Sequence, residues 1–351
     1  MNKATPISVL SYIQDAYHRY YNTAFWMRDK HLMDERNALL DQPGITAQDI
    51  LLETVHPYPS EVKIIDACNA AGLSQEVAVI LAKTIFDKDE NFKLRSHQAN
   101  SLVTSLNGKD EKRNVVVTSG TGSGKTESFL LPLLARLINE RFKSRKITLN
   151  DWWNSSGEET SWSGVRTNAD DAAVRSILLY PTNALVEDQV SRLRQAAFRA
   201  KEIHGEPMFY FGRYTGATPG GMYYPPEELA TKDKKRIKQM AADLRQIEKE
   251  AKSLVNTGME IRSQFSDPFC GEMLTRWDMI ESPPDIFITN VSMLNVMLMR
   301  PIENKIFEKT KHWLSESSEH VFTLVVDELH SYRGTQGTEV ALVVRNLLHR
   351  L

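Results

Sequence analysis

Residues 119–126 read Ser-Gly-Thr-Gly-Ser-Gly-Lys-Thr, between an apolar run at Asn114–Thr118 and a helix-like run at Glu127–Glu140. Glycines let backbone N–H groups turn toward a chain of phosphates, and the positive amino end of the following helix adds to the attraction. A strand, a glycine loop and a helix in this order predict a nucleotide-binding loop. A glycine-rich turn that binds nothing is the alternative. The residues expected to contact the nucleotide are Gly120, Thr121, Gly122, Ser123, Gly124, Lys125 and Thr126.

Two side chains of this loop have distinct expected roles. Lys125 would reach the β- and γ-phosphates, and the hydroxyl of Thr126 would hold Mg²⁺. The general pattern has glycine where this chain has Ser119. That position is the one departure from the pattern.

Composition limits the class of protein. The chain has 351 residues and a formal net charge of -2, so no overall basic field points to nucleic acid, and any such binding must come from local contacts. Its two cysteines, Cys68 and Cys270, fit neither a disulfide framework nor a zinc site. The first residues resemble neither a secretion signal nor a membrane span. We therefore expect a cytoplasmic protein without a membrane partner.

The hydrophobic pattern changes near residue 91. Residues 1–90 show helical periodicity and predict a helical accessory segment. From residue 91 to 351, short β-rich runs alternate with helices, which predicts an α/β domain with a mostly parallel sheet covered on both faces. The expected strands are Val115–Thr118, Ser176–Tyr180, Met208–Tyr214, Asp285–Thr289 and Phe322–Asp327.

Two inserts interrupt this alternation. Residues 143–175 are polar and turn-rich and predict a surface excursion. Residues 220–265 are dense in charge, with apolar residues near helical spacing, and predict a long exposed helix or helical hairpin. That helix could be merely solvated, or it could contact nucleic acid or a partner protein.

Residues 322–330 form an apolar run that ends in two adjacent carboxylates, Asp327 and Glu328. Asp327 suits Mg²⁺ ligation beside the phosphates, and Glu328 suits orienting or deprotonating the water that attacks the γ-phosphate. His330, just beyond, would report the state of the nucleotide. The alternative is a helix amino end that carries favourable acids.

Three further strand ends carry polar residues that fit phosphate groups: Pro181-Thr182-Asn183, Thr215-Gly216 and Thr289-Asn290. Free N–H groups and hydroxyls at such ends can bind a nucleic-acid backbone, and these contacts carry no base-sequence information. A Thr or Asn at a strand end can instead cap a helix. Because the three ends are expected on the sheet edge that carries the phosphate loop, we favour nucleic-acid contact.

The ordered motifs resemble the first RecA-like domain of superfamily two helicases of the DExH-box group. Leu94-Arg95-Ser96-His97-Gln98 resembles the glutamine motif of that family. The Gln98 amide can exchange one hydrogen bond in each direction with the adenine edge, which implies ATP as the ligand. An exposed Gln at a helix start is the alternative. Phe86 or Phe92 could stack on the base.

Longer strings resemble the mitomycin repair factor A-like branch, which includes large helicases of bacterial antiviral defence. They are Tyr20–Phe25, Pro283–Asn290 and Asp327–Gly334. The resemblance implies a motor acting on single-stranded or tailed DNA, usually 3′ to 5′, with possible protein partners of a repair or defence complex.

The chain reaches Leu351 without a Ser-Ala-Thr coupling motif. We therefore expect the amino-terminal part of a larger motor, with a second RecA-like domain downstream or in trans that supplies the arginine finger. Two alternatives stay open: a non-motor module that binds ATP and nucleic acid and recruits partners, and an RNA helicase.

Overall fold

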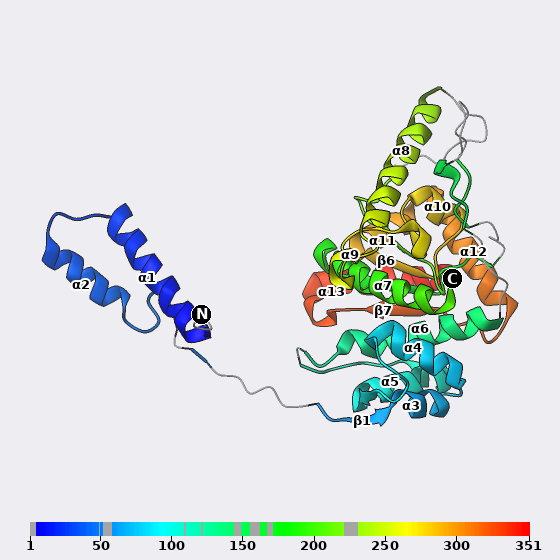
Figure 1. Ribbon diagram of the computed structural model, residues 1–351, viewed down its shortest axis with the longest axis horizontal. Coiled ribbons are helices and arrows are strands. Elements are labelled where there is room, and N and C mark those ends of the chain that lie inside the picture. Colours follow the sequence, from blue (N-terminus) through cyan, green and yellow to red (C-terminus); the bar gives the residue numbers. More distant parts are fainter. Residues whose placement is uncertain are drawn as a thin grey trace. The chain divides into compact units, whose positions relative to one another are not determined.

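The computed structural model describes residues 5–48, 50–51, 58–108, 110–120, 122–143, 149–154, 162–166, 171–220 and 231–351. Its contacts divide the chain into two compact units, Met1–Pro57 and Tyr58–Leu351 (Figure 1). The boundary expected near residue 90 lies inside the second unit. The assignment of residues 1–90 as an accessory segment stays a prediction.

The first unit is a pair of helices, α1 (Pro6–Ala24) and α2 (Lys30–Leu40). Thr5 and Ser8 form a capping box at the start of α1, and the Asp29 side chain caps α2. Arg36 links the two helices, since its guanidinium donates to Asn22 Oδ1 at 2.5 Å and to the Phe25 carbonyl at 2.6 Å. No residue of either helix is buried, so local hydrogen bonds hold this unit rather than a core.

The second unit contains a five-stranded parallel sheet with the strand order β5-β4-β6-β3-β7, which confirms the predicted α/β class. The strands are β3 (Ser176–Tyr180), β4 (Phe211–Arg213), β5 (Glu272–Met273), β6 (Ile286–Asn290) and β7 (Thr323–Val326). A separate antiparallel pair joins β1 (Ser60–Lys63) to β2 (Lys93–Arg95). The helices are α3 (Ile64–Ala70), α4 (Gln75–Phe86), α5 (Ser96–Asn107), α6 (Lys125–Lys143), α7 (Asn183–His204), α8 (Thr231–Ser253), α9 (Met259–Arg262), α10 (Arg276–Glu281), α11 (Val291–Met299), α12 (Asn304–Glu316) and α13 (Gly334–Arg350).

Helices cover both faces of the sheet, as the apolar strands predict. Successive side chains of a strand point to opposite faces, so Leu178 and Tyr180 join the core formed with α3–α7. Ile177 and Leu179 join a second core formed with α11–α13. The fully buried pattern of β3 is typical of a parallel sheet between two helical layers.

The strand expected at Val115–Thr118 is not formed. Residues 114–120 are irregular, and Val116 is 79% exposed. A strand needs a neighbouring backbone to satisfy its N–H and C=O groups. Edge strand β7 is separated from residues 114–120 by a cavity that both segments line, so it does not supply that neighbour. The prediction of a strand at Val115–Thr118 is therefore wrong.

The described parts of the two inserts pack on each other. Trp152 and Trp153, in the short helix η2 (Trp152–Asn154), form a core with Ile237, Met240 and Leu244 of α8. The Trp153 indole N–H also donates to Glu248 Oε2 at 2.8 Å. The long helix was predicted correctly, and Figure 1 shows it extending from the second unit. The tryptophans are buried, however, rather than part of a surface excursion.

Among the helices in the described part of the chain, none combines the length and apolar character needed to cross a lipid bilayer.

Candidate functional site

The glycine loop has the backbone that phosphate binding requires. Gly122 and Gly124 adopt positive φ angles of 74° and 76°, and Lys125 begins α6. A Cβ atom on Gly124 would collide with the side-chain amide of Gln98. Gly122 and Gly124 therefore both need glycine for their backbone conformation, and Gly124 also needs it because a side chain would not fit. Thr121 lies outside the described residues.

Side chains at the start of α5 contact the backbone carbonyls of the glycine loop. Arg95 Nη1 donates to the Gly122 carbonyl at 2.6 Å, and Gln98 Nε2 donates to the Gly124 carbonyl at 3.2 Å. Between them, His97 Nε2 lies 2.9 Å from the Ser123 carbonyl oxygen. The carbonyl and N–H of a trans peptide point in opposite directions, so these contacts turn the N–H groups of Gly124 and Lys125 away from α5. The glutamine motif predicts a functional role for Gln98, but it does not predict that Arg95 and His97 contact the loop.

Gln98 is 4% exposed, which excludes the alternative of an exposed Gln at a helix start. Its amide oxygen accepts from the Arg95 N–H at 3.0 Å, so both ends of the amide are engaged inside the chain. The Phe86 and Phe92 rings pack on each other with centroids 4.6 Å apart. Contacts of these three side chains with adenine stay predictions.

A cavity of about 990 Å³ brings the two nucleotide motifs together. Residues 114–120 and Lys125 line one side, and residues 321–330 of β7 and its continuation line the other. Lys125, Asp327, Glu328 and His330 therefore share one space. Ser119, the residue that departs from the general pattern, also lines this space and shares a hydrogen bond of 2.6 Å with the Ser123 hydroxyl.

The carboxylates lie where the strand ends in a strained turn. Asp327 N–H donates to the Leu179 carbonyl at 3.1 Å, and its Oδ1 accepts from the Glu328 N–H at 2.8 Å. Glu328 is left-handed, with φ 50°, a conformation that is costly outside glycine and is common at functional sites. His330 Nδ1 lies 3.2 Å from Glu328 Oε2. A 3₁₀ turn, Leu329–Ser331, follows, and α13 begins only at Gly334, so the two carboxylates do not lie at an α-helix amino end and that alternative is wrong.

The carboxylate of Asp327 influences two nearby tyrosines. Burial, and then the Asp327 charge, raise the pKa of the Tyr332 hydroxyl to about 12. Tyr180 shows the same direction, because burial and then Asp327 raise its pKa well above the usual range.

The three strand ends meet at the carboxyl edge of the sheet, as predicted. Asn290 pairs in register with Tyr180, and its Nδ2 donates to Asn183 Oδ1 at 2.7 Å. Thr182 and Asn183 are exposed, and Pro181 is half-buried. Asn290 Oδ1 accepts from the Met293 N–H at 2.7 Å, so this residue also caps α11, the role that the alternative assigned to it.

The threonine hydroxyls at this edge point inward. Thr289 is fully buried, and its hydroxyl donates to the Tyr214 carbonyl at 2.7 Å. Thr215 is also buried, and its hydroxyl accepts from the Ala217 N–H at 3.3 Å. The Thr289 hydroxyl thus joins two neighbouring strand ends and the Thr215 hydroxyl closes its own turn, whereas Gly216 and Thr182 are open to solvent. Backbone groups, rather than the Thr215 and Thr289 hydroxyls, are thus the candidates for phosphate contact.

The described residues contain no group of three or more His, Cys, Asp or Glu side chains placed to hold a metal. Mg²⁺ does not need one, because it commonly takes one or two protein ligands and completes its shell with water and substrate phosphates. Asp327 faces the cavity that Lys125 also lines, and Thr126 lies in the first turn of α6. This donor set fits Mg²⁺ bound together with a nucleotide.

Comparisons with known proteins agree with these motifs. Residues 95–210 match the DEAD/DEAH box helicase family. The Druantia protein DruE of Escherichia coli (strain UMEA 4076-1) is 32% identical over 384 residues, which covers 95% of this chain and 19% of that protein. An uncharacterized ATP-dependent helicase, MJ1574, of Methanocaldococcus jannaschii is 24% identical over 74% of this chain and 24% of its own length. The chain thus spans about a fifth of the length of these relatives.

Two solved helicases give weak structural matches. The Mycobacterium smegmatis helicase Lhr bound to ssDNA and AMP-PNP is 20% identical, with a TM-score of 0.39 over 73% of this chain and 21% of its own. The DUF1998 helicase MrfA is 19% identical, with a TM-score of 0.40 over 79% of this chain and 27% of its own.

Proposed function

We propose that this chain, whose residues 95–210 match the DEAD/DEAH box helicase family, is the ATP-binding motor region of an ATP-dependent DNA helicase or translocase. The observation that carries the proposal is the cavity shared by Lys125, Asp327 and Glu328. A cation on a glycine loop and two carboxylates at the end of a neighbouring strand are the parts that phosphoryl transfer to water needs.

In this proposal each residue acts on the phosphates or on water. Lys125 neutralises the terminal phosphates, and Glu328 orients the attacking water and accepts its proton. Thr126 and Asp327 would hold Mg²⁺, which would supply positive charge to offset the negative charge that develops on the phosphates. His330, beside Glu328, would couple the state of the nucleotide to movement on DNA.

Nucleic acid would lie along the carboxyl edge of the sheet. Gly216, Thr182 and Asn183 are exposed there, and α7 and α11 begin at this edge, so their free N–H groups can bind phosphates. We favour single-stranded or tailed DNA because the longer sequence strings resemble DNA helicases. A second RecA-like domain, protein partners in repair or antiviral defence, and a cytoplasmic location belong to the same proposal.

The test measures ATP turnover by this chain and by a longer form of the protein, with and without single-stranded DNA. We expect DNA-stimulated turnover in the longer form and its loss in Lys125→Ala. Lys88→Ala, which removes an exposed lysine outside the cavity, is the matched control and should retain activity. No turnover in the longer form, or full turnover in Lys125→Ala, would refute the motor. Stronger stimulation by RNA than by DNA would favour an RNA helicase.

A further inference from the structure

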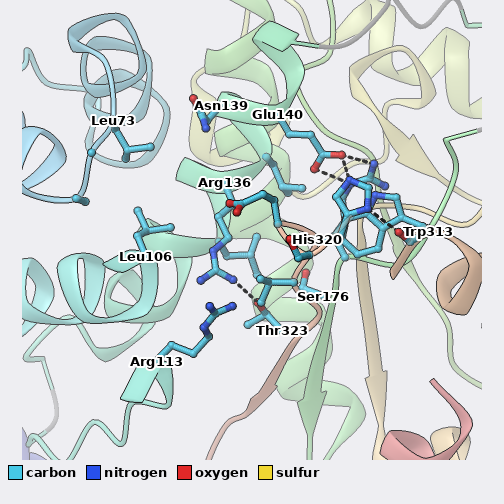
Figure 2. Close-up of a pocket in the computed structure, with 18 residues that line it drawn as sticks. Leu73, Leu106, Arg113, Arg136, Asn139, Glu140, Ser176, Trp313, His320 and Thr323 are labelled. Carbon is cyan, nitrogen blue, oxygen red and sulfur yellow. Dashed lines mark hydrogen bonds and ion pairs between the residues drawn. The ribbon is translucent and has the colours of Figure 1, made fainter. Parts of the chain in front are cut away.

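A second cavity, of about 440 Å³, lies at the opposite end of the central strands (Figure 2). Ser176 and Thr323, the first residues of β3 and β7, line it. Thr323 and Asp327 are four residues apart along an extended chain, or about 13 Å. Arg113, Arg136 and Thr323 also line the nucleotide cavity of about 990 Å³, so the two cavities meet here, at the start of β7 and away from Asp327.

Two arginines meet in this cavity, and in the part of the chain that the structure describes neither has an acidic partner. Figure 2 shows the guanidinium groups of Arg113 and Arg136 pointing toward each other. Arg113 Nε donates to the Gly108 carbonyl at 3.1 Å. Arg136 donates to the Thr323 hydroxyl at 3.4 Å and to the Ser105 carbonyl. All three acceptors are neutral, and within the described residues neither arginine forms an ion pair.

The carboxylates nearby do not neutralise this pair. Both carboxylate oxygens of Glu140 accept from Arg175 Nε, Oε1 at 2.9 Å and Oε2 at 2.8 Å. Glu319 lies at the rim and is exposed. Burial, and then the charge of Arg113, lower the pKa of the Arg136 guanidinium. Two cations that repel each other in a partly buried space are a feature that a bound anion would stabilise.

We propose that this cavity is a binding site for a small oxyanion, a carboxylate or a phosphate, held between Arg113 and Arg136. Each guanidinium presents a planar fork of N–H donors that matches two oxygens of such a group. The Thr323 hydroxyl, at the same place, can donate to a third oxygen. Leu73, Leu106 and Leu137 line the apolar side and leave room for an organic body on the anion. The arginine pair also lines the nucleotide cavity, and the proposal adds a second anion position at the start of β7 that does not depend on ATP binding at the glycine loop.

The experiment follows thermal unfolding of the chain during titration with sodium phosphate and, separately, with sodium succinate. Both titrations run at constant ionic strength with sodium chloride as the reference. The Lys125→Ala background reduces anion binding at the glycine loop. We expect a saturable rise in Tm with at least one of the two anions, and the stronger of them identifies the ligand class.

Substitutions assign the binding to the arginine pair. In the Lys125→Ala background, Arg113→Gln and Arg136→Gln should each weaken the saturable response at least about tenfold in midpoint concentration, as loss of a charged hydrogen-bonding partner requires. Lys112→Gln removes the same charge from an exposed neighbouring position and should leave the response unchanged. If Arg136→Gln does not fold, Arg113→Gln decides alone. No saturable rise, or an equal rise in the arginine variants and in Lys112→Gln, would overturn the proposal.

Discussion

At the residue scale, Gly124 combines a left-handed backbone with a lack of space for a methyl group. Its carbonyl also accepts the Gln98 amide, so a shift of this residue would move the whole support of the loop. We expect Gly124→Ala to destabilise the fold by about 1–3 kcal/mol and to weaken ATP binding. Urea unfolding and calorimetry measure the two effects.

Gly258→Ala is the matched control for this substitution. Gly258 has φ -59°, and a Cβ atom there would have no neighbour within 4 Å. The methyl group should therefore leave the stability and the ATP affinity nearly unchanged. Equal stability and equal ATP affinity of the two variants would show that the backbone conformation of Gly124 does not determine the structure of the loop.

Asp278 is a buried carboxyl outside the nucleotide cavity. Burial, opposed by hydrogen bonds from Thr275, Val165 and Trp162, raises its pKa to about 7. A folded pKa above the unfolded value means that the folded state binds the proton more tightly, so the stability falls as the pH rises from the unfolded pKa to the folded pKa of about 7, and then levels off. The folded state should lose about 2 kcal/mol between pH 5.5 and 8 from this group.

Asp278→Asn should remove this part of the pH dependence, since the amide carries no charge. The comparison is urea unfolding at pH 5.5 and pH 8. Asp243→Asn, at an exposed position of α8, should show the same change in unfolding free energy between the two pH values as the parent chain. If the pH dependence of the unfolding free energy is the same in Asp278→Asn as in the parent chain, another group causes it.

At the element scale, α8 is held to the sheet unit by an aromatic core rather than by charge. Trp153 is fully buried, stacks against Trp152 edge to face and donates to Glu248. We expect Trp153→Ala to cost about 3–5 kcal/mol, as for other buried aromatic residues, and to speed amide exchange in α8. Trp26→Ala, at a residue 67% exposed, is the control and should change neither. Unchanged exchange in α8 would contradict this packing.

The elements that the sequence predicts best are those with a periodic pattern. β3 and β6 lie within two residues of their expected positions because short, mostly apolar runs bounded by polar turns leave few alternatives. The run at Val115–Thr118 shows the limit of this signal, because strand formation depends on a neighbour that the local pattern does not reveal. β5 has two residues, too few for any periodicity.

At the scale of the whole molecule, the order of motifs along the chain predicted which residues gather. Lys125 and Glu328 are far apart in sequence, yet both line the cavity that lies between residues 114–120 and β7. What sequence did not reveal is the support of that site. Arg95 and His97 under the loop, and the inward-facing Thr215 and Thr289 hydroxyls, depend on tertiary contacts that carry no local pattern.

Net charge is similarly uninformative about local charge. The chain is nearly neutral overall, with a formal charge of -2, yet Arg113 and Arg136 face each other with no acidic partner among the residues whose side chains are described. A global sum excludes a strong long-range field but not a local anion site.

The central claim is that the cavity between residues 114–120 and β7 binds ATP. The most direct measurement is calorimetric titration of the chain with Mg-ATP, beside Lys125→Ala and the control Lys88→Ala. We predict saturable binding by the parent chain and by Lys88→Ala, and an affinity at least about tenfold lower in Lys125→Ala, which loses a charged contact to the phosphates. Equal affinity in all three proteins, or no binding by the parent chain, would contradict the account.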